Sequence, residues 1–196
     1  MPVKRQIASP DGVYFITFTC THWLPLIELT QSFDVVYNWF TYLKTKGHYV
    51  AGYIIMPNHV HMLIAFRNTG QSINTIIGNG KRFMAYEIIK RLKQQNNEYL
   101  LNRLHNLVNH SDKVRNKNHE IWEDSFDWKD CRDNEFMKQK LDYMHNNPCK
   151  GKWTLAAAPV DYAHSSAKNY ITGEQGIFEV LNYAALADID LTIRLS

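Results

Sequence analysis

The chain has 196 residues, 45% of them hydrophobic, and a formal net charge of +3 at pH 7. This size and apolar content predict an ordinary globular protein, so we expect a single domain over residues 1–196 and no low-complexity or repeat architecture. The three cysteines form no CxxC pair, and no stretch reaches the roughly 18 apolar residues of a membrane span, which excludes a disulfide scaffold and an integral membrane protein and favours the cytoplasm.

The N-terminal part of the chain predicts a strand followed by a helix. Residues 13–21 alternate in polarity and are rich in β-branched and aromatic side chains, which is typical of a strand. Ser32 is a suitable N-cap for a helix over residues 33–44, where apolar side chains recur at helical spacing. Gly47 then predicts the end of this helix.

A β-hairpin and a second helix follow. Residues 48–56 and 59–66 predict two strands, and only residues 57–58 separate them. A parallel pair needs a long crossover connection, so we expect these two strands to be antiparallel. Ser72 predicts the start of a helix that runs to about Lys93.

The next segment is less regular. Residues 94–118 are polar and rich in Asn and Gln, and we interpret them as an excursion without assigned secondary structure. A fourth strand is expected at about residues 121–128. A further helix is expected from an Asp133 cap to Asn147, where Pro148 ends it.

The order of these elements is βαββαβ with one helix after it. This order predicts an α+β protein of the ferredoxin-like or RRM-like kind, an antiparallel sheet covered on one face by two helices. The other face of the sheet is then expected to be open and available for function.

Basic residues gather in the middle of the chain. Residues 81–117 contain nine basic and three acidic side chains, whereas residues 118–196 have an excess of acidic ones. Such clustering is typical of a surface that binds a polyanion, and a solvated helix face is the alternative. The candidate contacts are the cations of the predicted helix, Lys81, Arg82, Lys90 and Arg91.

Two histidines alternate along an otherwise apolar predicted strand. Residues i and i+2 of a strand project from the same face, so His59 and His61 point in one direction and together can bind one metal ion. Ordinary hydrogen-bonded side chains are the alternative. Tyr143 and Asn147 are four residues apart in the last predicted helix, so they share a face and can both reach such an ion.

Three segments in this order and spacing resemble one family. They are Met-Pro-Asn-His-Val-His at residues 56–61, Tyr-Met-His-Asn-Asn-Pro at residues 143–148, and the segment 161–170 with its serine pair and final tyrosine. They resemble the single-tyrosine HUH transposases of IS-two-hundred-like insertion sequences, and among these the REP-associated tyrosine transposases. The resemblance covers about residues 10–173.

The resemblance implies a role for each motif residue. His59 and His61 correspond to the histidines that hold a divalent magnesium or manganese ion, and Asn147 to the amide that completes the metal site. Tyr143 corresponds to the nucleophile, on a helix near the C-terminal part of an RRM-like domain. Lys81 corresponds to a lysine that contacts the phosphate or the DNA backbone.

The implied reaction follows from the chemistry of these groups. A free tyrosine has a pKa of about 10 and is a poor nucleophile at neutral pH, so it needs a cation that polarises the phosphate. Attack by Tyr143 gives a 5′-phosphotyrosine and a free 3′-hydroxyl. The expected function is therefore metal-dependent cleavage and transfer of single-stranded or hairpin DNA, in transposition or in the processing of repeated palindromes. A homodimer on the DNA is compatible with it.

Two other functions stay open. A non-catalytic nucleic-acid-binding module needs only the RRM-like sheet and the basic segment. A histidine–metal hydrolase acting on a small phosphoester would use water as its nucleophile, but it needs more ligands than we can place. The sequence also departs from the family at His164, at Cys149 and in the long excursion 94–118, which bears on the choice of DNA more than on the chemistry.

Overall fold

The computed structural model describes residues 6–151 and 154–194. The strands in this part of the chain are β1 (Gly12–Thr19), β2 (Tyr49–Ile55), β3 (His59–Phe66) and β4 (Asp127–Asp130). The α-helices are α1 (Leu26–Leu29), α2 (Phe33–Thr45), α3 (Ile73–Gln94), α4 (Glu98–Asn106), α5 (His110–Val114), α6 (Asn134–His145) and α7 (Ala167–Thr172). Short 3₁₀ turns lie at Thr21–Trp23, Asn147–Cys149, Pro159–Asp161 and Tyr183–Asp188.

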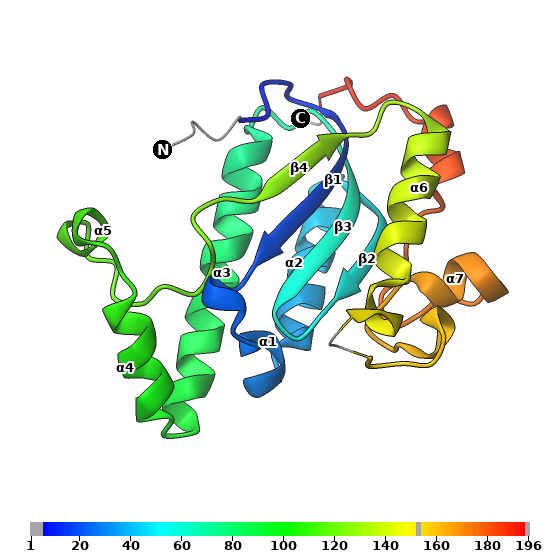
Figure 1. The fold of residues 1–196 in the computed structure, drawn as a ribbon. Coiled ribbons are helices and arrows are strands. Elements are labelled where there is room, and N and C mark those ends of the chain that lie inside the picture. The colour runs from blue at the N-terminus through cyan, green and yellow to red at the C-terminus, as the bar shows by residue number, and fades with distance from the viewer. Residues whose placement is uncertain (1–5, 152–153, 195–196) are drawn as a thin grey trace.

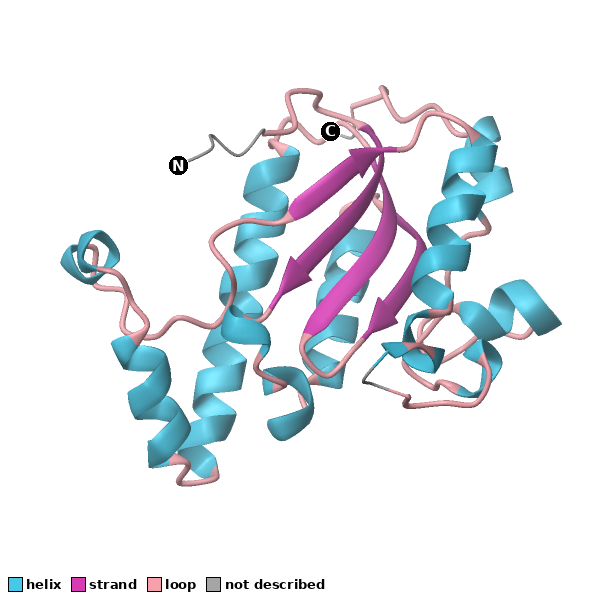
Figure 2. Ribbon diagram, viewed as in Figure 1, coloured by secondary structure: helices cyan, strands magenta, loops and turns pink. Residues whose placement is uncertain are grey.

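The four strands form one antiparallel sheet in the order β2-β3-β1-β4 (Figure 1). β1 pairs with β3 along its whole length, from Gly12 opposite Phe66 to Thr19 opposite His59. Helices α2 and α3 lie together on one face of the sheet, and α6 lies beside β2 (Figure 2). This topology confirms the predicted α+β sandwich.

Alternation along β3 separates its side chains between the two faces of the sheet. Val60 and Met62 belong to the larger apolar core, together with α2 and α3. His59, His61 and Leu63 point the other way, as the strand geometry requires. All eight residues of β3 are buried, so both faces of this central strand are covered.

The expectation that the second face of the sheet is open is wrong, because α6 packs on it. Leu141 and Met144 of α6 are buried in a second apolar cluster that includes Leu63 and Ala65 of β3. Gly52 of β2 makes this close approach possible, because an added Cβ would lie 2.6 Å from Met144 Cε and nearer still to Leu141. The predicted reach of Tyr143 to the histidine pair agrees with a helix on this face, but periodicity did not indicate that α6 would bury the face along β2 and β3.

Gly52 is therefore expected to set the distance between α6 and the sheet. The Gly52→Val variant should lose about 1–3 kcal/mol of unfolding free energy, because Leu141 and Met144 must shift to admit the new side chain. Chemical denaturation followed by circular dichroism measures the loss. Gly78→Ala is the matched control, since a Cβ at this exposed helical position meets nothing within 4 Å. Equal stability of the two variants would contradict this account of the packing.

The excursion 94–118 contains two helices, so the assignment of no secondary structure was wrong. α4 presents Leu100, Leu101 and Leu104 to the core at helical spacing. Asn97 caps α4, because its side-chain oxygen accepts the Leu100 N–H at 3.1 Å. The polar composition of the segment concealed this short apolar stripe.

The fourth strand lies later in the chain than predicted. We expected it at residues 121–128, and the structure has it at Asp127–Asp130, paired with β1. Trp122 makes only an isolated bridge to Cys20, and its indole N–H donates to the Lys81 carbonyl at 2.8 Å. The apolar part of the segment thus packs as irregular chain, while the polar part forms the exposed edge strand.

The predicted free thiols are confirmed, as Cys20 and Cys131 are buried, Cys149 is half-buried and all three are unpaired. Burial raises the pKa of Cys131 to about 11, so its thiol is unreactive at neutral pH. Among the described residues, no helix is both long and apolar enough to cross a bilayer.

Candidate active site

The two histidines of the predicted metal site lie at the start of β3 and face each other. Only 5% of His59 and 6% of His61 is exposed. Their rings meet edge to face, with centroids 4.7 Å apart. The His61 ring also stacks on Phe15 of β1 at 5.4 Å, which fixes its plane. This spacing allows both imidazoles to reach one ion.

Each histidine is oriented by a hydrogen bond at Nδ1. The Asn58 side-chain oxygen lies 2.7 Å from His59 Nδ1, and Thr17 Oγ1 lies 2.6 Å from His61 Nδ1. An amide oxygen only accepts, so His59 carries its hydrogen on Nδ1 and keeps the lone pair of Nε2. Partners of this kind orient metal-ligating histidines in proteins. Neither support was predicted from the sequence, although Asn58 directly precedes the pair.

Burial keeps both imidazoles uncharged. It lowers the pKa of His59 to about 4 and that of His61, which also lies next to His59, to about 3. Neutral imidazoles with a free Nε2 are the protonation state that binds metal ions. By burial and charge, the pair therefore fits a divalent cation, and the tautomer of His59 leaves its Nε2 available as a ligand.

Tyr143 is the third predicted residue that the structure brings to this place. Its ring lies edge to face with His61 at a centroid distance of 5.5 Å and with Phe15 at 6.2 Å. Tyr143 is 57% exposed. The hydroxyls of the half-buried Tyr162 and Tyr170 instead donate to carbonyls of β2. Tyr143 is thus not an ordinary core tyrosine.

Asn147 follows Tyr143 by one turn, but not on the same α-helix. α6 ends at His145, two residues earlier than predicted, and Asn147 begins the 3₁₀ turn that contains Pro148. Proline has no N–H to continue the α-helix, which explains the change. Asn147 is half-buried there.

The neighbouring motif residues hold α6 in place. The Nε2 atom of His145 lies 2.8 Å from Ser166 Oγ, and Ser166 Oγ accepts the Tyr53 N–H of β2 at 2.9 Å. Through these contacts His145 and Ser166 tie the end of α6 to the backbone of β2. The ring of His164 stacks on Phe33 with centroids 3.8 Å apart.

No protein-family model matches the sequence, and the comparison with curated proteins found no match. A solved structure of a REP-associated tyrosine transposase bound to a REP hairpin matches 100% of this chain and 99% of its own, with a TM-score of 0.56 and 15% sequence identity. The chain has the fold of that transposase. A crystal structure of a transposase candidate from Deinococcus radiodurans R1 matches 74% of this chain and 97% of its own, at 13% identity and a TM-score of 0.36, too low to indicate a shared fold.

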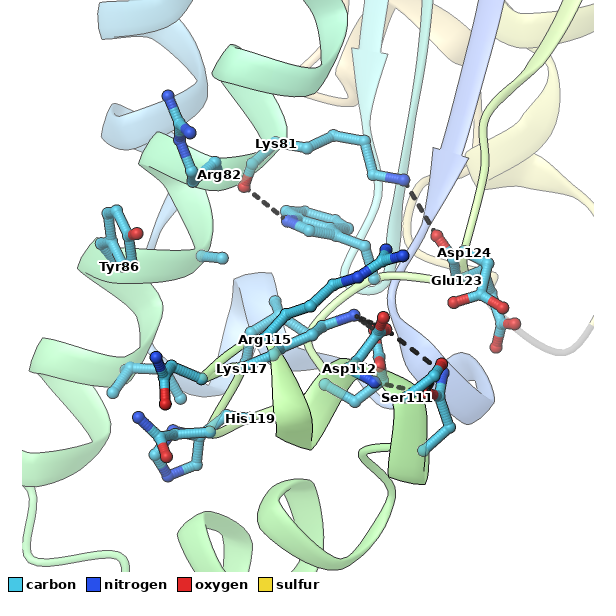
Figure 3. A pocket seen from close by; sticks show the side chains of 18 of the residues that line it. Lys81, Arg82, Tyr86, Ser111, Asp112, Arg115, Lys117, His119, Glu123 and Asp124 are labelled. Atoms are coloured by element: carbon cyan, nitrogen blue, oxygen red, sulfur yellow. Dashed lines mark hydrogen bonds and ion pairs between the residues drawn. The ribbon is translucent and has the colours of Figure 1, made fainter.

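The basic segment borders a cleft of about 1030 Å³ between α3 and residues 109–124 (Figure 3). Lys81 and Arg82 line this cleft. The Lys81 ammonium donates to the carbonyls of Glu123 and Ser125 at 2.9 and 3.0 Å, so it ties α3 to the segment before β4. Arg82 is exposed, and its guanidinium donates to Asn79.

The other two predicted DNA contacts differ in accessibility. Arg91 pairs with Asp34 at 2.6 Å and donates to the Gln31 carbonyl at 2.6 Å, so it joins α3 to the start of α2. Lys90 is exposed and pairs with Glu87 of its own helix at 3.2 Å. Of the four candidates, Arg82 and Lys90 are the ones whose charges face solvent.

A carboxylate cluster also lies in this cleft. Oxygen atoms of Asp112, Glu120 and Asp124 lie within 4.8 Å of one another. The Lys117 ammonium pairs with Glu120 at 2.6 Å and with Asp112 at 3.3 Å, as Figure 3 shows for Lys117 and Asp112. A lysine thus supplies the positive charge that this cluster needs, and the histidine pair remains the candidate metal site.

The buried histidines make the stability of the fold depend on pH. Burial lowers the pKa of His48 and His145 to about 4, as it does for His59, and that of His61 to about 3. An unfolded histidine titrates near 6.5, so between pH 6.5 and 4 the unfolded chain binds protons that the folded chain excludes. Stability is then present above pH 6.5 and falls as the pH is lowered through this window.

We expect a loss of about 1–2 kcal/mol for each of these histidines between pH 7 and pH 5. Urea denaturation at both pH values measures the total. His48→Asn is an informative variant, because an asparagine oxygen can still accept the Arg67 N–H that His48 Nδ1 accepts at 3.2 Å. This variant should reduce the loss of unfolding free energy between pH 7 and pH 5 by the contribution of one histidine, about 1–2 kcal/mol. A stability that does not change between pH 7 and pH 5 would refute the burial argument.

Proposed function

We propose that this chain cleaves and transfers single-stranded or hairpin DNA, with Tyr143 as the nucleophile. The observation that best supports this is the exposed Tyr143 ring lying against His61, 5.5 Å from it, beside the buried and neutral pair. The fold is shared with a tyrosine transposase whose structure contains a REP hairpin. A small-molecule hydrolase has no need for an exposed tyrosine at this place.

In this proposal His59, His61 and Asn147 hold a magnesium or manganese ion. When bound, such an ion polarises the scissile phosphate and offsets the charge that develops on it. Asn58 and Thr17 keep the two imidazoles in the orientation that leaves Nε2 free. The two imidazoles are thus preorganised for metal binding without DNA.

The covalent step belongs to Tyr143. Its Oη atom bonds to phosphorus, the bond from phosphorus to the 3′ oxygen breaks, and the phenolic proton is lost while the 3′ oxygen gains one. The products are a 5′-phosphotyrosine and a 3′-hydroxyl, and the reverse reaction with another 3′-hydroxyl joins two strands. No nucleotide cofactor is needed, because the phosphotyrosine bond retains the energy of the phosphodiester.

The exposed position of Tyr143 suits a large, flexible substrate. An unpaired strand can place its phosphate against the exposed Tyr143 more easily than a stacked duplex can. Arg82 and Lys90 supply cations for its backbone. Because Tyr143 and His61 meet within one chain, the proposed site needs no second protomer, although a homodimer on DNA is compatible with it.

The experiment uses hairpin oligonucleotides with single-stranded flanks, taken from repeats near the gene and labelled at either end. The protein is incubated with them in manganese and separated on a denaturing gel. We expect a covalent protein–DNA band that carries the label on the 3′ side of the cleavage site and that EDTA prevents. Binding to the same oligonucleotides without such a band would favour the non-catalytic nucleic-acid-binding module instead.

A further inference from the structure

A strained turn presents a tryptophan at the edge of the two-histidine site. The turn Thr21–Trp23 joins β1 to α1, and its residues His22 and Trp23 have φ angles of 51° and 57°. Two successive non-glycine residues in the left-handed region are unusual, and strained backbone of this kind clusters at functional sites. Trp23 is 58% exposed. The turn therefore keeps a large apolar ring in water, where it adds little to folding.

Side chains from distant parts of the sequence hold this turn. Glu123 Oε1 accepts the His22 N–H at 2.8 Å. The Asn58 amide nitrogen donates to the Trp23 carbonyl at 3.1 Å, and the oxygen of the same amide accepts from His59 Nδ1. One amide thus fixes both the backbone of Trp23 and the tautomer of His59.

The indole lies directly beside the candidate metal ligand. The Trp23 and His59 rings have centroids 6.0 Å apart and planes inclined at 68°. This edge-to-face contact places the indole against His59, while more than half of the surface of Trp23 stays open to solvent. A flat, rigid aromatic surface beside a site for unpaired DNA is a suitable platform for a base, since bases stack on aromatic side chains in single-strand binding.

We propose that Trp23 is a nucleobase-binding subsite, which stacks one unpaired base of the strand next to the scissile phosphate. The position of this subsite next to a phosphate that is cleaved rests on the function proposed above, whereas the stacking of an unpaired base on Trp23 does not. Stacking uses the π-face common to all four bases, so the subsite positions the strand without selecting its sequence. Trp23 is thus a positioning residue, and the proton and bond changes stay with Tyr143.

The test measures stacking without cleavage. All proteins carry Tyr143→Phe, and the probes are the flanked hairpin oligonucleotides with 2-aminopurine placed at successive unpaired positions. Stacking on an indole quenches 2-aminopurine emission. We expect strong quenching at one or two adjacent positions, its loss in Trp23→Ala with about tenfold weaker binding, and its retention in Trp23→Phe, whose ring still stacks.

Tyr42→Ala is the matched control, because Tyr42 is 50% exposed on α2, away from the histidine face. It should change neither quenching nor affinity, and circular dichroism verifies the fold of each variant. Unchanged quenching and affinity in a folded Trp23→Ala protein would overturn the subsite. Cleavage is measured separately, as the covalent band formed by the protein that keeps Tyr143. If that protein forms no band but quenching still depends on Trp23, the proposed reaction is wrong and the base-binding subsite stands.

Discussion

Replacing Tyr143 by phenylalanine is expected to abolish the covalent protein–DNA product, with a loss of at least about 10⁴-fold in its rate of formation. The variant removes only the hydroxyl of a side chain that is more than half exposed. The ring that contacts His61 and Phe15 remains. Folding stability and DNA affinity should therefore stay close to those of the original protein.

Single-turnover kinetics on the hairpin oligonucleotides, with the product resolved on a denaturing gel, measure this loss. Tyr99→Phe is the control, because Tyr99 is 73% exposed on α4 and loses the same atom. It should react at the original rate. If the covalent band persists in Tyr143→Phe, another residue is the nucleophile and the proposed assignment is wrong.

Replacing either histidine of the pair by alanine should remove both metal binding and the reaction. A single imidazole with one half-buried amide is a weak site for a divalent ion, so we expect manganese affinity to fall beyond measurement by calorimetry and the cleavage rate to fall at least about 10³-fold. The effect should be similar for His59→Ala and His61→Ala, because both imidazoles are proposed to bind the same ion.

A smaller loss of metal binding is expected when Asn58, the hydrogen-bond partner of His59, is replaced. Asn58→Ala removes the acceptor of the Nδ1 hydrogen, and changes of this kind cost about 10–100-fold in metal affinity or activity. His48→Asn is the control for loss of a buried imidazole elsewhere, and it should leave manganese binding unchanged. If His61→Ala binds manganese as tightly as the original protein, the ion binds elsewhere, and the carboxylates around Lys117 become the first place to look.

Local signals in the sequence predicted the central elements well. The alternation through His59 and His61 marked β3, and the Ser72 cap is confirmed because its hydroxyl oxygen accepts the Thr75 N–H at 3.2 Å. The spacing of Tyr143 from the histidine pair became meaningful through the family resemblance, and the structure brings the rings of Tyr143 and His61 together.

Other features depend on contacts between distant residues, which periodicity cannot reveal. β4 is a polar edge strand that exists because β1 offers it backbone partners. The close packing of α6 on the sheet requires that Gly52 has no side chain. From the sequence alone, a glycine in a strand indicates only a less stable strand. The turn at His22 and Trp23 contains no glycine to signal its left-handed backbone, and Asn58 and Glu123 impose it from elsewhere.

The packing of α6 bears on how DNA strands are exchanged in the proposed reaction. Residues on either side of Tyr143 are fixed, since Leu141, Met144 and His145 are all buried and the last is bound to Ser166. The tyrosine thus belongs to a rigid part of the molecule and not to a mobile arm. In the proposed reaction the attached DNA end stays where it was made, and the incoming 3′-hydroxyl has to travel to it. The rate of strand joining would then be set by the refolding and exchange of the DNA, and not by a movement of the protein.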